Sequence, residues 1–212
     1  MSKDTGCAEN NSIIVSGEIA SSILFSHEIY GEGFYSFELK SARLSGNADV
    51  LIITVSERIL NCQNINIGDT VSIKGQIRSY NTIVNKKNRL ALTIFAREIE
   101  VTDNEDCNVV CIDGFVCKAP VYRKTPFGRE IADVLLAVNR SYNKSDYIPC
   151  IFWGRNAKYV GGLSTGDNIM VWGRMQSRQY QKKTDELVEE RTAYEVSASR
   201  MERKKTNDES CT

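Results

Sequence analysis

Residues 68–79 read Gly-Asp-Thr-Val-Ser-Ile-Lys-Gly-Gln-Ile-Arg-Ser, and residues 166–177 read Gly-Asp-Asn-Ile-Met-Val-Trp-Gly-Arg-Met-Gln-Ser. The two stretches share their two glycines, the first aspartate and the final serine at an offset of 98 residues, and apolar residues match between them. Self-similarity at a fixed spacing is the mark of an internal repeat and outranks local signals for the fold.

Upstream of these stretches the offset becomes 97 and stays at that value. It joins Gly17 to Gly114, Arg43 to Arg140, and several further pairs. A repeat of about 100 residues has the size of a whole small domain. The sequence therefore predicts two tandem domains at 1–105 and 106–202, followed by a short flexible tail at 203–212.

Each copy contains five short runs rich in β-branched or aromatic residues, which predict strands. In the first copy they are Ser12–Ala20, Phe34–Ser41, Asp49–Val55, Thr70–Tyr80 and Arg89–Glu100. In the second copy they are Val109–Cys117, Glu130–Asn139, Asp146–Trp153, Asn168–Tyr180 and Val188–Ser199.

One short helix is predicted between the third and fourth strands of each copy, near Glu57–Cys62 and Arg155–Val160. This order of elements predicts an all-β protein of two OB-folds, which are small five-stranded Greek-key barrels. The polar segments Asn81–Asn88 and Gln181–Glu190 are predicted hairpin tips, where such barrels usually bind ligands. Glu100–Asn108 is the predicted linker.

The composition is that of a soluble globular protein, with 42% hydrophobic and 25% charged residues. No apolar stretch is long enough to cross a bilayer and no secretory signal begins the sequence, so we expect no membrane association and a cytoplasmic location. Seven cysteines, an odd number, then favour reduced thiols. Neither a catalytic constellation nor a phosphate-binding loop is present, so we expect no enzymatic activity and no cofactor.

A zinc site at Cys107, Cys111 and Cys117 is disfavoured. The sequence has no Cys-x-x-Cys pair, and its single histidine, His27, belongs to the other copy. A tetrahedral set of four ligands is therefore hard to assemble. We expect no bound metal, and Cys111, Cys117 and Cys150 are expected to be core or half-buried residues.

Charge is distributed unevenly although the net charge is zero. Residues 1–107 hold 10 basic and 14 acidic side chains, and residues 108–183 hold 12 basic and 5 acidic ones. A local excess of positive charge is what a phosphate-binding face requires, because binding then releases condensed counterions. Charge alone does not separate such a face from an ordinary solvated surface.

Four segments of the second copy resemble, in order and spacing, the motifs of bacterial single-stranded DNA-binding proteins. They are Gly-Phe-Val-Cys-Lys-Ala-Pro-Val-Tyr-Arg-Lys-Thr-Pro-Phe-Gly-Arg-Glu at 114–130, Leu-Leu-Ala-Val-Asn-Arg-Ser-Tyr at 135–142, Asp-Tyr-Ile-Pro-Cys-Ile-Phe-Trp-Gly-Arg-Asn-Ala at 146–157, and the stretch at 166–180. The resemblance implies a protein that coats single-stranded DNA without sequence preference in replication, recombination or repair. The family usually presents four OB-folds per assembly, so it also implies a homodimer.

The family's base-stacking positions are occupied in this sequence by Tyr142, Tyr147, Trp153 and Tyr180. Stacking of unpaired bases on aromatic rings contributes about 1–3 kcal/mol per base and reads no sequence. Alternation on the fourth strand predicts Ile169, Val171, Gly173 and Met175 inside the barrel, with Trp172, Arg174, Gln176, Arg178 and Tyr180 on the other face. Trp172 fits a subunit contact equally well. Phe127 is a weaker candidate for DNA contact, because it lies in a predicted exposed turn at 125–128.

Basic side chains of the second copy supply the candidate phosphate contacts. They are Arg123, Lys124, Arg129, Arg140, Arg155, Arg174 and Arg178. Arg140, Arg155 and Arg178 are the strongest candidates, because each lies within two positions of a proposed stacking ring.

The first copy lacks most of these aromatic and basic side chains. Ser45, Ser56, Lys74 and Glu32 stand at the positions of Tyr142, Trp153, Trp172 and Arg129. The first copy keeps a smaller set of arginine and aromatic residues, which are Arg43, Arg58, Arg78, Tyr30, Phe34, Tyr35 and Tyr80. With its acidic balance, the first copy is expected to bind DNA weakly at most and to act chiefly as a scaffold, a dimer surface or a partner site.

Two alternative functions stay open at this point. One is a primosome-type accessory protein that acts mainly through protein contacts, and the other is an RNA-binding OB protein. The aromatic and arginine residues of 108–183 favour DNA coating over the first of these. The last residues lack the acidic and apolar tip with which family members recruit replication and repair proteins, so recruitment of such partners by that route is in doubt.

Overall fold

The computed structural model describes residues 9–84, 87–104, 106–184 and 187–204. They form two compact units. We call Ile13–Asn108 together with Met175–Glu195 the N-terminal unit. Met1–Ser12, Val109–Arg174 and Val196–Thr212 are the C-terminal unit.

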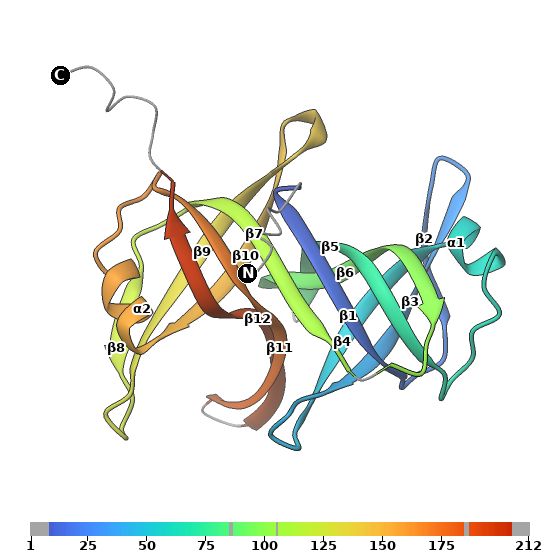
Figure 1. Ribbon diagram of the computed structural model, residues 1–212, viewed down its shortest axis with the longest axis horizontal. Helices are drawn as coiled ribbons and strands as arrows, with labels where there is room; N and C mark the ends of the chain where they lie inside the picture. Colours follow the sequence, from blue (N-terminus) through green and yellow to red (C-terminus); the bar gives the residue numbers. More distant parts are fainter. Residues whose placement is uncertain (1–8, 85–86, 105, 185–186, 205–212) are drawn as a thin grey trace, which may run out of the picture. The chain divides into compact units, whose positions relative to one another are not determined.

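In its described residues, the first repeat consists of strands and one short helix (Figure 1). They are β1 (Asn11–Ile19), β2 (Leu24–Ile29), β3 (Glu32–Ala42), β4 (Ala48–Ser56), α1 (Glu57–Asn61), β5 (Thr70–Val84) and β6 (Lys87–Val101). Strand β1 pairs with both β3 and β5, β3 pairs with β4, and β6 joins β4 to β5. These pairings close a five-stranded barrel in which only the β4–β6 contact is parallel.

The second repeat has the same elements and one additional 3₁₀ turn. They are β7 (Asn108–Val116), β8 (Val121–Lys124), β9 (Glu130–Arg140), η1 (Ser141–Asn143), β10 (Lys144–Trp153), α2 (Gly154–Val160), β11 (Asn168–Thr184) and β12 (Leu187–Arg203). Strand order β7-β11-β12-β10-β9, closed by β7–β9, repeats the first barrel. The prediction of two OB-folds is confirmed.

Strand alternation explains why these segments fold into barrels. In β10 the even-numbered residues 146 to 152 are almost completely buried, whereas the odd-numbered Tyr147 and Trp153 are exposed; Ile151, on the same face as these two rings, is also buried. Both cores consist mainly of branched aliphatic residues, together with a few buried rings such as Phe37 and Phe152. Burying a side chain of this size contributes about 1.5–3 kcal/mol.

The repeated glycines Gly75 and Gly173 have the same structural cause. A Cβ atom at either position would lie 2.2 Å from a carbonyl oxygen, that of Phe95 or of Ser197. Only glycine permits this approach between neighbouring strands. Conservation of the glycine between the two copies therefore reflects the barrel itself and not a ligand.

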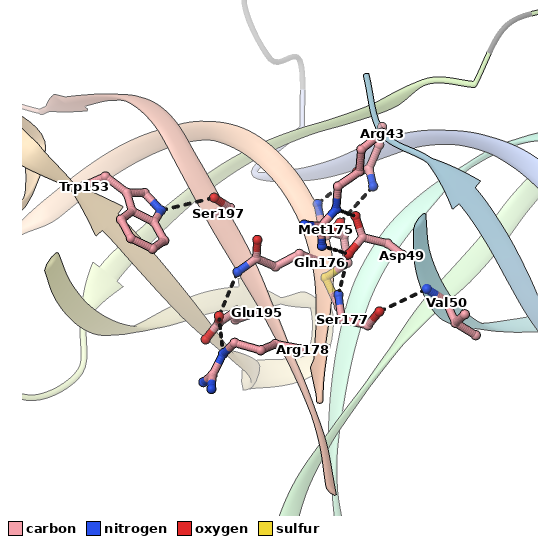
Figure 2. A network of polar contacts seen from close by, with 11 residues as sticks. Arg43, Asp49, Val50, Trp153, Met175, Gln176, Ser177, Arg178, Glu195 and Ser197 are labelled. Carbon is pink, nitrogen blue, oxygen red and sulfur yellow. Dashed lines mark hydrogen bonds and ion pairs between the residues drawn. The ribbon is translucent and has the colours of Figure 1, made fainter. Parts of the chain in front are cut away.

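The long hairpin of β11 and β12 contributes to both units, because its tip, Met175–Glu195, belongs to the N-terminal unit. There the Ser177 amide donates to Asp49 Oδ1 at 2.8 Å, and the Val50 amide donates to Ser177 Oγ at 3.0 Å (Figure 2). The compact units are thus discontinuous in sequence. The boundaries at 105/106 and 202 stay a prediction about which segments fold independently.

Two edge strands were not predicted, β2 and β8. Every residue of both strands is exposed, so neither has the alternation of burial that identifies a strand in a sequence. Parts of four predicted segments lie outside the described residues: the two hairpin tips (85–86 and 185–186), the linker (105) and the tail (205 onward). The two α-helices in the described ranges, of five and seven residues, are too short to cross a membrane.

Candidate nucleic-acid interface

Two exposed rings, Tyr147 and Trp153, lie on the outer face of β10 in the C-terminal unit. Tyr147 is 42% exposed and Trp153 is 41% exposed, although the residues that alternate with them on the inner face are buried. A tryptophan with so much exposed surface on a regular strand is not needed for the barrel core. The strand therefore presents two aromatic surfaces to solvent.

Trp153 is held in place by its polar edge. The indole Nε1 donates to Ser197 Oγ on β12 at 3.4 Å (Figure 2). On the other side, Trp153 pairs with Ile131 of β9, which is buried. One edge of the ring is thus anchored to the sheet, so little side-chain freedom remains to be lost when a ligand stacks on it.

Tyr142 and Phe127 occupy exposed turns near the ends of strands. Tyr142 lies in η1 with a left-handed backbone, φ 61°, and its side chain is fully exposed. Phe127 lies in a tight turn closed by a hydrogen bond from the Gly128 amide to the Thr125 carbonyl, and it is equally exposed. Both rings are available to a ligand, and neither is held by the sheet as Trp153 is.

The predicted outward face of β11 is divided between the two units. Trp172 and Arg174 belong to the C-terminal unit, and Arg178 and Tyr180 belong to the N-terminal unit. Trp172 is half-buried and lies 4.6 Å beneath the guanidinium of Arg200. The guanidinium of Arg178 lies 5.6 Å from the exposed ring of Tyr180.

Gln176 does not lie on an exposed face as the alternation predicted. It is buried, and its Nε2 donates to Glu195 Oε1 at 2.8 Å. The same carboxylate oxygen accepts from Arg178 Nε at 3.4 Å (Figure 2). A buried amide is tolerated when it is hydrogen-bonded, and this pairing explains why the polar residue is enclosed.

Several predicted phosphate contacts are engaged in ion pairs within their own unit. Arg140 Nη1 lies 3.4 Å from Asp146 Oδ1, and Asp146 is completely buried. Arg123 Nη2 lies 2.9 Å from Asp133 Oδ2, with both side chains well exposed. An exposed pair of this kind contributes little and leaves the guanidinium free to exchange partners. The Arg140 pair instead compensates a buried charge.

The first repeat contains the same buried pair. Arg43 Nε donates to Asp49 Oδ2 at 2.6 Å, and Asp49 is almost completely buried. The hydrogen bond from Arg43 to Asp49 raises the pKa of the guanidinium above its usual value, and the charge of Asp49 acts in the same direction. Duplication of the pair in both barrels indicates a structural role, so Arg140 is a weaker candidate for phosphate binding than its position in the sequence suggested.

Arg155 and Arg129 are the basic candidates best placed to meet a phosphate. Both side chains are exposed, and neither takes part in an ion pair within the described ranges. Arg155 lies in the first turn of α2, two residues after Trp153. Lys124 is also exposed, at the end of β8.

The N-terminal unit differs at the equivalent positions. Ser56 is buried, and Phe34, one of the aromatic residues that survive there, is a core residue whose ring stacks on His27 at 5.0 Å. Tyr30 and Tyr80 are exposed, and Tyr35 is in edge contact with Phe25. The exposed aromatic surface of this unit thus comes from several elements: Phe25 on β2, Tyr30 in the turn after it, Tyr80 on β5 and Tyr180 on β11.

The sequence-based prediction missed the exposed ring of Phe115. Phe115, on β7, is 41% exposed and pairs with Ala137, the residue that also pairs with Tyr147. Alternation along β7 could have identified Phe115 as an outward-facing residue. Ile112, Gly114 and Val116 form the buried face of the strand, and Phe115 lies between two of them.

No disulfide joins the cysteines of the described ranges, and Cys111 and Cys150 are buried, as expected. Within the same ranges no group of three histidine, cysteine or acidic side chains lies close enough to hold a metal ion.

Comparison with known proteins gives matches of two kinds. A family model, the single-strand binding protein family, matches residues 107–204. Single-stranded DNA-binding protein 1 of Staphylococcus aureus (strain COL) is 40% identical over 81 residues, which are 35% of this chain and 48% of that protein. Single-stranded DNA-binding protein A of Bacillus subtilis (strain 168) is 35% identical over 88 residues, 38% of this chain and 51% of that protein. The chain spans about half the length of these relatives.

A solved structure matches both repeats together. The wild-type single-stranded DNA binding protein from Thermus aquaticus superposes with a TM-score of 0.75 at 18% identity, covering 93% of this chain and 94% of that chain. At this level of identity the match establishes a shared fold across both barrels.

Proposed function

We propose that this chain binds single-stranded DNA without strong sequence preference, because the model of the single-strand binding protein family matches residues 107–204. In this role it coats the strand during replication, recombination or repair, as a binding protein and not as an enzyme. The relatives' names do not favour the alternative of an accessory protein that acts mainly through protein contacts.

The observation that carries this proposal is the outer face of β10. Tyr147 and Trp153 expose their rings there, and Arg155 follows directly in α2. Unpaired bases expose flat π-faces that stack on such rings whatever their identity, and a guanidinium beside a ring neutralises the adjoining phosphate. Duplex DNA hides these faces within its base stack, so the arrangement selects for single strands.

We further propose that the C-terminal unit provides most of the affinity. The rings of Tyr147 and Trp153 have no aromatic counterpart in the N-terminal unit, where Val50 and Ser56 stand in their place. A homodimer would bring four barrels to one strand, and replication or repair proteins are its expected partners. We place this activity in the cytoplasm, with the DNA.

The proposal is tested by fluorescence anisotropy with a labelled oligo-dT, using unlabelled single-stranded RNA and duplex DNA as competitors. We expect competition by single-stranded DNA of any sequence and weak competition by duplex. The logarithm of affinity should fall linearly with the logarithm of salt concentration, by about 0.7 per phosphate contact. Equal competition by duplex would contradict the stacking mechanism, and stronger competition by RNA would assign a different substrate.

A further inference from the structure

Phe115 lies in a row of three side chains that crosses the outer face of the C-terminal unit. Phe115 on β7 is paired with Ala137 on β9, and Ala137 is paired with Tyr147 on β10. Both pairs are antiparallel, and residues directly opposite each other in such a pair project from the same face of the sheet. The three side chains therefore lie side by side, with the two rings at the ends.

The row has the dimensions of a site for one base. Neighbouring strands lie about 4.8 Å apart, so the two ring-bearing strands are separated by about 10 Å. Between them stands the methyl group of Ala137, which fills little of that space. Phe115 and Tyr147 are exposed to the same degree, 41% and 42%. A flat base can lie over the alanine with a ring on each side.

The side of Phe115 that faces away from Ala137 is bounded by an anchored polar group. Phe115 is also paired with Asn168 on β11, and Asn168 Nδ2 donates to Asp113 Oδ1 at 2.9 Å and to the Gly114 carbonyl at 3.2 Å. With its carboxamide committed to these acceptors, Asn168 is held in place and bounds the row on this side.

The first repeat provides an internal comparison. Its barrel has the same row in the same register, with Glu18 paired to Lys40 and Lys40 paired to Val50. These residues stand at the positions of Phe115, Ala137 and Tyr147. The barrel therefore folds with no ring at either end and with a long side chain in the middle, so its architecture does not require Phe115 or the small residue beside it.

We propose that Phe115 is a further base-stacking residue, which together with Tyr147 and the gap over Ala137 holds one base of a single strand. The inference rests on the proposed function, since it assigns an additional contact to the same DNA-binding face. It extends that face from β10 across β9 to β7, so the strand crosses the sheet instead of following β10 alone.

The test uses full-length protein and labelled oligo-dT in the anisotropy assay. Phe115→Leu keeps an apolar side chain of similar size and removes the ring, and we expect affinity to fall about fivefold or more. Ala137→Leu keeps both rings and fills the gap, and we expect a loss of similar size. Lys40→Leu, at the equivalent place in the first repeat, is the matched control and should leave affinity within twofold of wild type.

Urea unfolding midpoints of all three variants separate loss of binding from loss of structure. Reduced affinity of Phe115→Leu and Ala137→Leu at an unchanged midpoint supports the site. Wild-type affinity in both folded variants overturns it, and leaves the proposed function intact as long as wild-type protein binds oligo-dT. Absence of binding by wild-type protein would instead overturn the proposed function.

Discussion

Replacing Arg140 with alanine should destabilise the protein more than it weakens DNA binding. Asp146 is completely buried, and Arg140 Nη1 lies 3.4 Å from its Oδ1. Removing one partner of a buried ion pair costs about 3–5 kcal/mol, because the other charge stays enclosed. The Arg140 side chain is 33% exposed and the contact is long, so solvent already screens part of the interaction. We therefore expect a loss of about 1–3 kcal/mol.

Urea unfolding followed by circular dichroism measures this loss. With a slope of about 2 kcal/mol per molar, the midpoint should fall by roughly 0.5–1.5 M. Combining Arg140→Ala with Asp146→Asn should cost less than the sum of the two single changes, because the double variant encloses no unpaired charge. Arg43→Ala is the matched variant in the first repeat, where Asp49 is also buried.

The opposite pattern would assign Arg140 to phosphate binding. If Arg140→Ala leaves the midpoint unchanged and lowers the slope of log affinity against log salt by about 0.7, the guanidinium contacts phosphate and its contact with Asp146 contributes little.

Three further predictions concern the binding face. Arg155→Ala should lower the salt slope by about 0.7 with no change in unfolding midpoint, whereas an unchanged slope would remove Arg155 from the phosphate contacts. Trp153→Ala should weaken oligo-dT binding by about 1–3 kcal/mol in anisotropy, and a folded variant with wild-type affinity would exclude that ring. Full-length protein with Tyr147→Val and Trp153→Ser carries the residues of the first repeat at these two positions and should bind oligo-dT at least about 30-fold more weakly. A loss of less than about fivefold would show that other surfaces provide most of the affinity.

The barrels were predictable because each of their strands buries one face. The predicted bounds of β9, Glu130–Asn139, differ from the observed ones by one residue, since hydrophobic alternation covers the whole strand. β2 and β8 escaped prediction because they are exposed along their length and are defined only by pairing with a neighbour. Pairing of that kind leaves no periodic signal in a sequence.

The site was predictable only as far as residue type and alternation reach. The resemblance to single-stranded DNA-binding proteins singled out Tyr147 and Trp153, whose rings are exposed on β10. Alternation was applied only to β11. It failed for Gln176, whose burial depends on a carboxylate from β12 that no local pattern identifies. Neither residue type nor alternation could predict the role of Arg140, because an arginine can contact either phosphate or a buried carboxylate.

Bases are expected to stack on Trp153, and a protein with a single tryptophan reports on this contact without interference from another indole. The chain has two tryptophans, so Trp172→Phe leaves Trp153 as the only indole. Titrating this variant with poly-dT should quench its fluorescence in proportion to the binding measured by anisotropy, because a stacked base covers the ring. Full binding with unchanged indole emission would place the DNA elsewhere on the protein and contradict the account.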